Sequence, residues 1–267
     1  MERSSPVYQT YVKILERELV PAMGCTEPIA IAYCAAVARS VLGELPDRIH
    51  VVASGNIIKN VKSVVVPNTG GRRGMETAAA IGALGGDETA GLEVIAHVPQ
   101  KAKDRLERYL RETKITVGAA QTDHVLDIEV TVSKGNSRAV VRAVNEHTNL
   151  VYIEKNGQVL EERPIEKRED PDAPDYTLLN VADICEFART CELSDVSAIL
   201  DRQIACNTAV AEEGLRGDYG ANVGSTLLKA YGTDIKIRAK ARAAAGSDAR
   251  MSGCELPVVI NSGSGNQ

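Results

Sequence analysis

Cys25 is the residue whose surroundings most favour chemistry. It stands in Gly24–Pro28, directly before an apolar stretch with helical character. Unpaired backbone N–H groups and the helix dipole at a helix N-terminus stabilise a thiolate and lower its pKa. We therefore predict that Cys25 acts as a base, a nucleophile or an iron ligand. The competing interpretation is a small buried residue at a tight turn.

A second candidate site is a glycine-rich loop after the apolar run 64–66 and before a helical pattern. Its residues are Asn68, Thr69, Gly70, Gly71, Arg72 and Arg73. A strand, a glycine-rich loop and a helix N-terminus together favour anion binding. The loop lacks the G-x-x-x-x-G-K-[ST] and G-x-G-x-x-G spacings of nucleotide sites. It therefore predicts a site for a small carboxylate, clamped by the arginines, with a solvated basic turn as the alternative.

Two further loops carry side chains suited to carboxylate or ammonium groups. One is Ser54–Asn56, and the other, at the end of the sequence, contains Ser262, Ser264 and Asn266. The histidines have no partner at helical i, i+4 spacing, so we expect no histidine metal site and interpret them as structural or surface residues. They are His50, His97, His124 and His147.

Composition indicates an ordinary globular protein that does not bind nucleic acid or membranes. The 267 residues are 44% hydrophobic and 25% charged, and the net charge of −5 gives no general attraction to phosphate backbones or anionic lipid. The sequence contains no apolar run of membrane-spanning length, and its N-terminus is polar. We expect a cytoplasmic protein with reduced cysteines, none of them in a C-x-x-C pair.

Hydrophobic periodicity predicts the elements that must position these residues. Helices are expected at 6–20, 28–42, 75–84, 101–112, 177–189, 195–214, 218–231 and 235–246. Strands are expected at 48–53, 57–66, 114–117, 126–132, 138–144 and 148–154, with a hairpin turn at 155–158. This order predicts an α+β fold with a helical N-terminal hairpin, a central α/β sheet domain and a helical C-terminal region.

The proline-rich, charged stretch 161–175 predicts a boundary between domains. We expect residues 1–45 to pack with the C-terminal helices, 46–165 to form the α/β sheet domain, and 170–267 to form an incomplete helical domain.

Four segments together resemble the cysteine desulfidase branch of the serine dehydratase alpha-chain family. They are Met23–Pro28, Ser54–Asn60, Pro67–Glu76 and Ser262–Gln267, and the resemblance runs over the whole chain. It implies a [4Fe-4S] lyase, without pyridoxal phosphate, that converts L-cysteine into pyruvate, ammonia and sulfide, or L-serine into pyruvate and ammonia. It implies that a base removes the α-proton while an open cluster iron binds the leaving group.

By this resemblance, Cys25 is that base, as a thiolate, or else a cluster ligand, and the Asn68–Arg73 loop holds the substrate carboxylate. The family's main cluster cysteines would follow the terminal glycine-serine loop. We therefore expect this chain to be an N-terminal portion that lacks the cluster and is inactive. The remaining cysteines show no iron-ligand spacing, and Cys34 is expected to be packing in a buried helix; the others are Cys185, Cys191, Cys206 and Cys254.

The expected partner is a small L-amino acid, cysteine or serine, and formation of a homo-oligomer stays open. One alternative is a non-catalytic amino-acid-binding or regulatory module built from the same loops. Another is a pyridoxal phosphate lyase, for which Lys59 or Lys62 would supply the Schiff-base amine.

Overall fold

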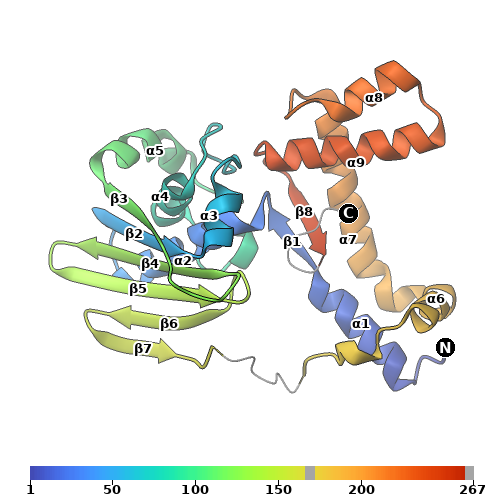
Figure 1. Cartoon of the computed structure of the whole chain (residues 1–267), viewed down its shortest axis with the longest axis horizontal. Coiled ribbons are helices and arrows are strands. Elements are labelled where there is room, and N and C mark those ends of the chain that lie inside the picture. Colours follow the sequence, from blue (N-terminus) through green and yellow to red (C-terminus); the bar gives the residue numbers. More distant parts are fainter. Residues whose placement is uncertain (166–171, 262–267) are drawn as a thin grey trace.

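The computed structural model describes residues 1–165 and 172–261, which form two lobes (Figure 1). One lobe is a sheet with helices, and the other is a group of helices with a two-stranded ribbon. The expected α+β fold, with N-terminal helices, a central sheet and a helical C-terminal region, is confirmed.

The sheet lobe is a mixed six-stranded sheet and its helices. The helices are α2 (Thr26–Leu42), α3 (Gly55–Val61), α4 (Met75–Gly85), the 3-10 turn η1 (Gly91–Glu93) and α5 (Gln100–Glu112). The strands are β2 (Arg48–Ala53), β3 (Lys114–Ala119), β4 (Asp127–Lys134), β5 (Ser137–Val144), β6 (Leu150–Lys155) and β7 (Gln158–Glu162). They lie in the order β3-β2-β4-β5-β6-β7, and only β2 and β3 are parallel among these described neighbours.

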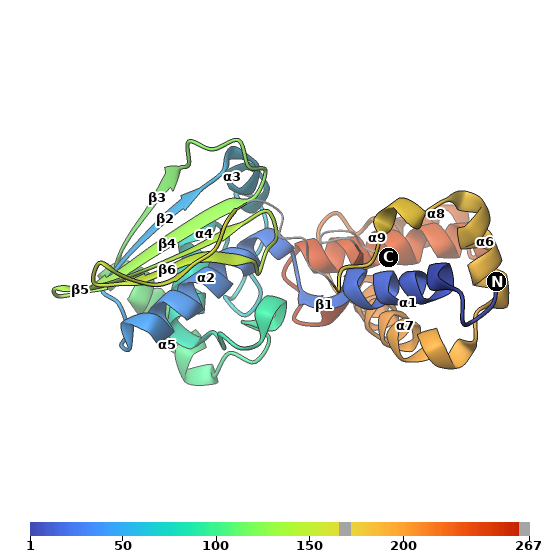
Figure 2. The same cartoon turned by 90° about the horizontal axis from the view of Figure 1, so that it is seen from below.

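Helices α2, α4 and α5 lie on one side of this sheet (Figure 2). The alternation along β4 explains the arrangement, because Ile128, Val130 and Val132 are fully buried while the residues between them are partly exposed. α2 packs on β4, β5 and α4. It carries no charge from Pro28 to Ala38, which suits a helix enclosed between a sheet and another helix.

The helical lobe joins the two ends of the chain. It contains α1 (Pro6–Glu18), β1 (Leu19–Met23), the 3-10 turn η2 (Tyr176–Leu178), α6 (Val181–Thr190), α7 (Leu193–Arg216), α8 (Val223–Tyr231), α9 (Ile235–Met251) and β8 (Pro257–Asn261). β1 and β8 pair antiparallel, with Leu19 opposite Asn261 and Met23 opposite Pro257. This ribbon packs on α7, so the N-terminal segment is part of the helical lobe.

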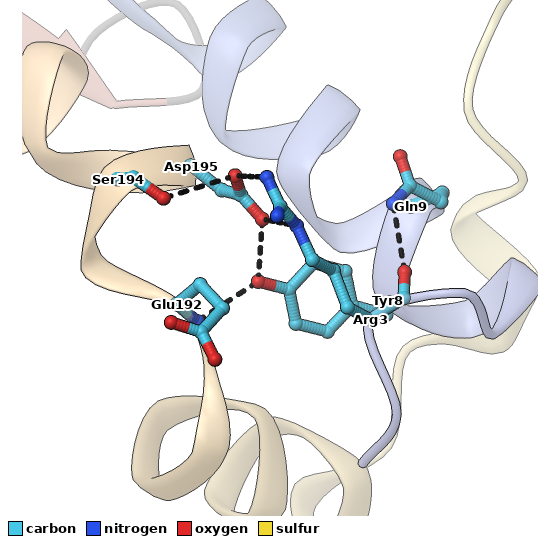
Figure 3. A network of polar contacts seen from close by, with 6 residues as sticks. All are labelled: Arg3, Tyr8, Gln9, Glu192, Ser194 and Asp195. Carbon is cyan, nitrogen blue, oxygen red and sulfur yellow. Dashed lines mark hydrogen bonds and ion pairs between the residues drawn. The ribbon is translucent and has the colours of Figure 1, made fainter.

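A polar network anchors α1 to α7 (Figure 3). The buried Tyr8 hydroxyl donates to Asp195 Oδ2 at 2.8 Å and accepts from the Glu192 backbone N–H at 2.9 Å. Arg3 donates to the same carboxylate at 2.8 Å. Tyr8 and Tyr11 also pack edge-on against Phe187, so the network closes a small aromatic core. Asp195, in the first turn of α7, is thus the acceptor that joins the N-terminal segment to α7.

Most predicted elements are present. One predicted strand is wrong, and one observed strand was not predicted. The expected strand 57–66 is wrong, because α3 covers residues 55–61 and buries Ile57 and Val61 on one helical face, and residues 62–66 form only an isolated bridge between Val65 and Arg73. β1 was not expected, because residues 19 and 20 were assigned to the first helix; α1 ends at Glu18, and Leu19 begins a strand of the two-stranded ribbon.

The placement of residues 1–45 also needs correction. α1 contacts α7, but α2 packs on the sheet, so these residues divide between the two lobes and do not all pack with the C-terminal helices. The domain boundaries themselves stay a prediction. Within the described parts of the chain, no helix is both long enough and apolar enough to cross a bilayer.

Candidate functional site at the N-terminus of α2

Cys25 is the first residue before α2, where β1 turns into the helix. Its backbone is extended, and its side chain is 8% exposed. The Sγ atom donates a hydrogen bond to Glu27 Oε2 at 2.8 Å. The thiol therefore faces a carboxylate and is not sealed among aliphatic side chains.

The protonation state of Cys25 differs from our expectation. Burial and the hydrogen bond to Glu27 raise the pKa of the Cys25 thiol to about 12, although its position at a helix N-terminus favours the thiolate. Desolvation and a neighbouring negative charge outweigh the helix dipole. In this structure Cys25 is a neutral thiol, which corrects the prediction of a lowered pKa.

Glu27 is the polar centre of the site. Burial alone would raise its pKa, but hydrogen bonds from Cys25 and from Asn60, at 3.0 Å to Oε1, outweigh burial and keep the pKa below its ordinary value. Glu27 is therefore ionised at neutral pH. Asn60 lies at the end of α3, so the short helix that replaces the expected strand brings this amide to the carboxylate.

A cleft of about 410 Å³ opens beside Glu27. Its polar lining consists of Glu27, Asn56, Asp123, His124, Asn145 and His147, and its apolar lining of Ile57, Val125 and Leu126. Burial lowers the pKa of His147, so its imidazole is neutral at pH 7. Two carboxylates, two amides and no lysine or arginine among these lining residues favour a ligand with a positive end.

The side chains of the Asn68–Arg73 loop mostly hold the loop itself. Buried Asn68 donates to the Ile95 carbonyl at 2.6 Å and accepts from Lys103, and buried Thr69 donates to the Val66 carbonyl at 2.6 Å. Both side chains are bonded inside the sheet lobe.

The two arginines of the loop also have protein partners. Arg72 donates to the Thr69 carbonyl at 2.9 Å and forms an ion pair of 3.4 Å with Glu107. Arg73 donates to the Ser63 carbonyl at 2.7 Å. Gly70 and Gly71 directly precede the arginines and have positive φ angles. None of the six loop residues lines the cleft beside Glu27.

The loop and the Cys25 turn meet at one point. Gly24 has φ +72°, and a Cβ built on it lies 2.8 Å from Pro67 Cγ, just before the loop. The role of the loop as a carboxylate clamp stays a prediction. Ser262, Ser264 and Asn266 lie outside the described residues.

Sequence reasoning did not assign roles to Glu27, Asn60 or His147. Glu27 lies in the motif Met23–Pro28, and Asn60 lies in the motif Ser54–Asn60. Their place in these two motifs was the feature of the sequence that could have identified them as site residues. His147 was interpreted as structural, and no local pattern connects it with α2. It reaches the site only because the turn between β5 and β6 lies beside the start of that helix.

The described residues do not fit a [4Fe-4S] cluster, which needs about four cysteine ligands. Cys34 and Cys254 are buried, Cys185 is exposed, and Cys191 and Cys206 are intermediate. Across residues 1–165 and 172–261, no three His, Cys, Asp or Glu side chains converge in a way that could hold a metal ion. Among these residues, Cys25 is the thiol at the candidate site.

The fold and the site define an α+β protein with a thiol–carboxylate pair beside a polar cleft. The chain belongs to the serine dehydratase alpha chain family, whose model matches residues 89–267. It is 54% identical to a UPF0597 protein of Desulfitobacterium hafniense over 100% of this chain, and 52% identical to one of Lachnoclostridium phytofermentans over 98%. A UPF0597 protein of Treponema denticola is 45% identical over 97%.

The chain spans 62% of the length of each of these three relatives. No solved structure matches the sequence.

Proposed function

We propose that this chain forms the substrate-binding part of a lyase that removes the β-substituent of a small L-amino acid. L-cysteine is the favoured substrate, and L-serine is the other. The observation that carries the proposal is the Cys25–Glu27 pair, a thiol 2.8 Å from an ionised carboxylate that lines a polar cleft. Membership of the serine dehydratase alpha chain family supports this class of reaction.

The cleft suits the positive end of an amino acid. Glu27 and Asp123 offer carboxylates to an α-ammonium group, and Asn56 and Asn145 offer amides. The described cleft lining contains no lysine or arginine for the substrate carboxylate, so that end requires another donor, such as backbone N–H groups. The Asn68–Arg73 loop stays our proposal for that role.

The elimination needs a base for the α-proton. In our proposal Cys25 Sγ takes this proton while its own thiol proton passes to Glu27 Oε2, so the net proton acceptor is the carboxylate. The Cβ–S or Cβ–O bond breaks with its electron pair on the leaving atom. The resulting aminoacrylate is hydrolysed to pyruvate and ammonia. This relay avoids a free thiolate, which the pKa of about 12 disfavours.

In the longer family members a [4Fe-4S] cluster would supply Lewis-acid chemistry to the leaving group. Its ligands would have to come largely from outside the described residues, because these bring no suitable group together. The cluster and the activity of the whole protein are therefore proposals about the longer family members.

The binding half of the proposal is tested by calorimetry with L-cysteine and L-serine under anaerobic conditions. We expect the wild-type chain to bind one of them, and Glu27→Gln to weaken binding at least tenfold. Glu212→Gln is the matched control, because Glu212 is a carboxylate of α7 that pairs with Arg242 and lies outside the cleft. Equal binding by wild type and Glu27→Gln would rule out this cleft as the amino-acid site.

A non-catalytic amino-acid-binding module is the second candidate, and the neutral state of Cys25 favours it. The two functions differ in whether they depend on the Cys25 thiol. A module keeps ligand binding after Cys25→Ala and releases no pyruvate from either amino acid. A lyase releases pyruvate and loses it after the same change, when assayed in a longer family member that carries the Cys25 motif.

A further inference from the structure

Arg250 is a buried charged residue at the joint between the two lobes. It lies near the end of α9 and is 4% exposed. Its Nε donates to the Gly24 carbonyl at 2.9 Å, across 226 positions of sequence. Burying a guanidinium is costly unless it is hydrogen-bonded and near negative charge. The buried charge of Arg250 must therefore be stabilised by groups around it.

Two close glycine contacts pack this joint, one from the segment after α9 and one from the turn before Cys25. A Cβ built on Gly253, which has φ +83°, lies 2.4 Å from Val65 Cγ1. A Cβ on Gly24 lies 2.8 Å from Pro67 Cγ. Both backbones approach their neighbours at distances that only glycine allows. The end of α9, the Cys25 turn and the segment 65–67 thus form one packed unit.

Negative charge lies on the sheet-lobe side of this joint. Glu27 is ionised and half-buried, and it attracts the Arg250 guanidinium, as Cys25 would in its anionic form. Arginine stays protonated at neutral pH even where burial lowers its pKa. Arg250 therefore brings a permanent positive charge from the helical lobe to the candidate site.

We infer that Arg250 is a positioning residue that fixes the Gly24–Cys25 turn, so that the Cys25 thiol points at Glu27 beside the cleft. The helical lobe thereby holds the geometry of a site whose cleft lies in the sheet lobe. Only the expected effect of Arg250 on ligand binding rests on the proposed function. The hydrogen bond to the Gly24 carbonyl defines it independently of any ligand.

The test measures how fast iodoacetamide labels each cysteine of the folded chain, read by mass spectrometry. In Arg250→Ala we expect labelling of Cys25 to rise about tenfold relative to exposed Cys185 in the same molecule. Arg250→Lys keeps the charge and one donor but not the Nε geometry, so we expect an intermediate ratio. Arg242→Ala is the matched control, because Arg242 lies on the same helix and pairs with Glu212 on α7.

A purely structural role would lower the melting temperature of Arg250→Ala and leave the Cys25-to-Cys185 ratio unchanged, and that result overturns the inference. If Arg250→Ala does not fold, Arg250→Lys decides by the same ratio. Calorimetry with L-cysteine separates the two claims. Absence of binding by the wild type counts against the proposed function alone, whereas unchanged Cys25 labelling counts against Arg250 alone.

Discussion

The Cys25 thiol donates its proton to Glu27 Oε2 across 2.8 Å, and this pair holds a neutral sulfur beside an ionised carboxylate. After burial, Glu27 is the main reason why the pKa of Cys25 is raised. Each member of the pair therefore influences the pKa of the other, and a substitution of one residue should change the pKa of its partner.

We predict that Glu27→Gln lowers the pKa of Cys25 toward that of an ordinary thiol. The amide still accepts a hydrogen bond but carries no negative charge, so the thiolate is less disfavoured. Iodoacetamide labelling of Cys25 at pH 9 should then rise about tenfold, because only the thiolate reacts. The rate is measured from pH 7 to 11 by mass spectrometry. An unchanged pH profile would show that burial alone sets this pKa.

We predict that the protein loses stability above pH 9. Burial raises the pKa of both Cys25 and Cys34 to about 12, whereas the unfolded chain has thiols near 9. Between these values the unfolded state has released protons that the folded state retains. The free energy of unfolding should therefore fall by about 1.4 kcal/mol per pH unit for each buried thiol.

Cys34→Ala tests this prediction, because Cys34 is fully buried in α2 and has no role in the candidate site. The unfolding free energy is measured in urea between pH 9 and 11. In Cys34→Ala its decrease per pH unit should be smaller than in wild type by the contribution of one thiol, about 1.4 kcal/mol. Cys185→Ala is the control, because Cys185 is exposed. A slope that is the same in Cys34→Ala and wild type would contradict the assignment.

We predict that Asp127→Asn destabilises the sheet lobe by about 3 kcal/mol at pH 7. Asp127 is 2% exposed and accepts two hydrogen bonds from Arg142, at 2.9 and 2.7 Å, across β4 and β5. Burial opposes ionisation, but the bonds from Arg142 and Thr122 prevail and lower the pKa of Asp127.

The ion pair contributes its full stability at pH values above the ordinary pKa of a carboxyl. That stability is lost as the pH falls through the lowered pKa that Asp127 has in the folded protein. The difference between wild type and Asp127→Asn should therefore shrink between pH 5 and pH 3 in urea unfolding. Arg138→Gln, on the same face of β5, is the control and should cost below about 0.5 kcal/mol, because Arg138 is 54% exposed and its pair with Glu154 is long, at 3.8 Å.

We predict that Gly82→Ala destabilises the protein by more than about 3 kcal/mol. A Cβ at Gly82 lies 2.2 Å from the Ala32 carbonyl oxygen, so the substitution forces α2 and α4 apart in the main core. Gly246→Ala in α9 is the matched control. Its Cβ meets only ordinary contacts, the nearest at 3.5 Å, and helix propensity favours alanine by about 1 kcal/mol. Thermal unfolding of the two variants should shift in opposite directions.

The sequence was sufficient to predict elements whose periodicity agrees with their surroundings. The helices at 75–84 and 101–112 and the strands of the antiparallel sheet are examples. It failed at 57–66, where Ile57, Ile58 and Val61 favour a strand by residue type. The spacing of Ile57 and Val61 nevertheless places both on the buried face of a short helix.

The candidate site could be predicted only in part, because local patterns do not report the environment of a side chain. Cys25 is at a helix N-terminus as expected, but the sign of its pKa shift depends on burial and on Glu27, two residues later. His147 and Arg250 come from distant segments that folding brings to α2. No spacing rule in the sequence connects them with Cys25.

The pairing of β1 with β8 has a consequence for biosynthesis. The sheet lobe is encoded by one uninterrupted stretch, from α2 to β7, and most of its pairings are between neighbouring strands, which favours rapid folding. β1 is translated before all of it but has no described partner strand until β8 leaves the ribosome. The ribbon that leads into the Cys25 turn therefore pairs only after the whole sheet lobe has been translated, and we expect a folded sheet to precede a finished site in nascent chains.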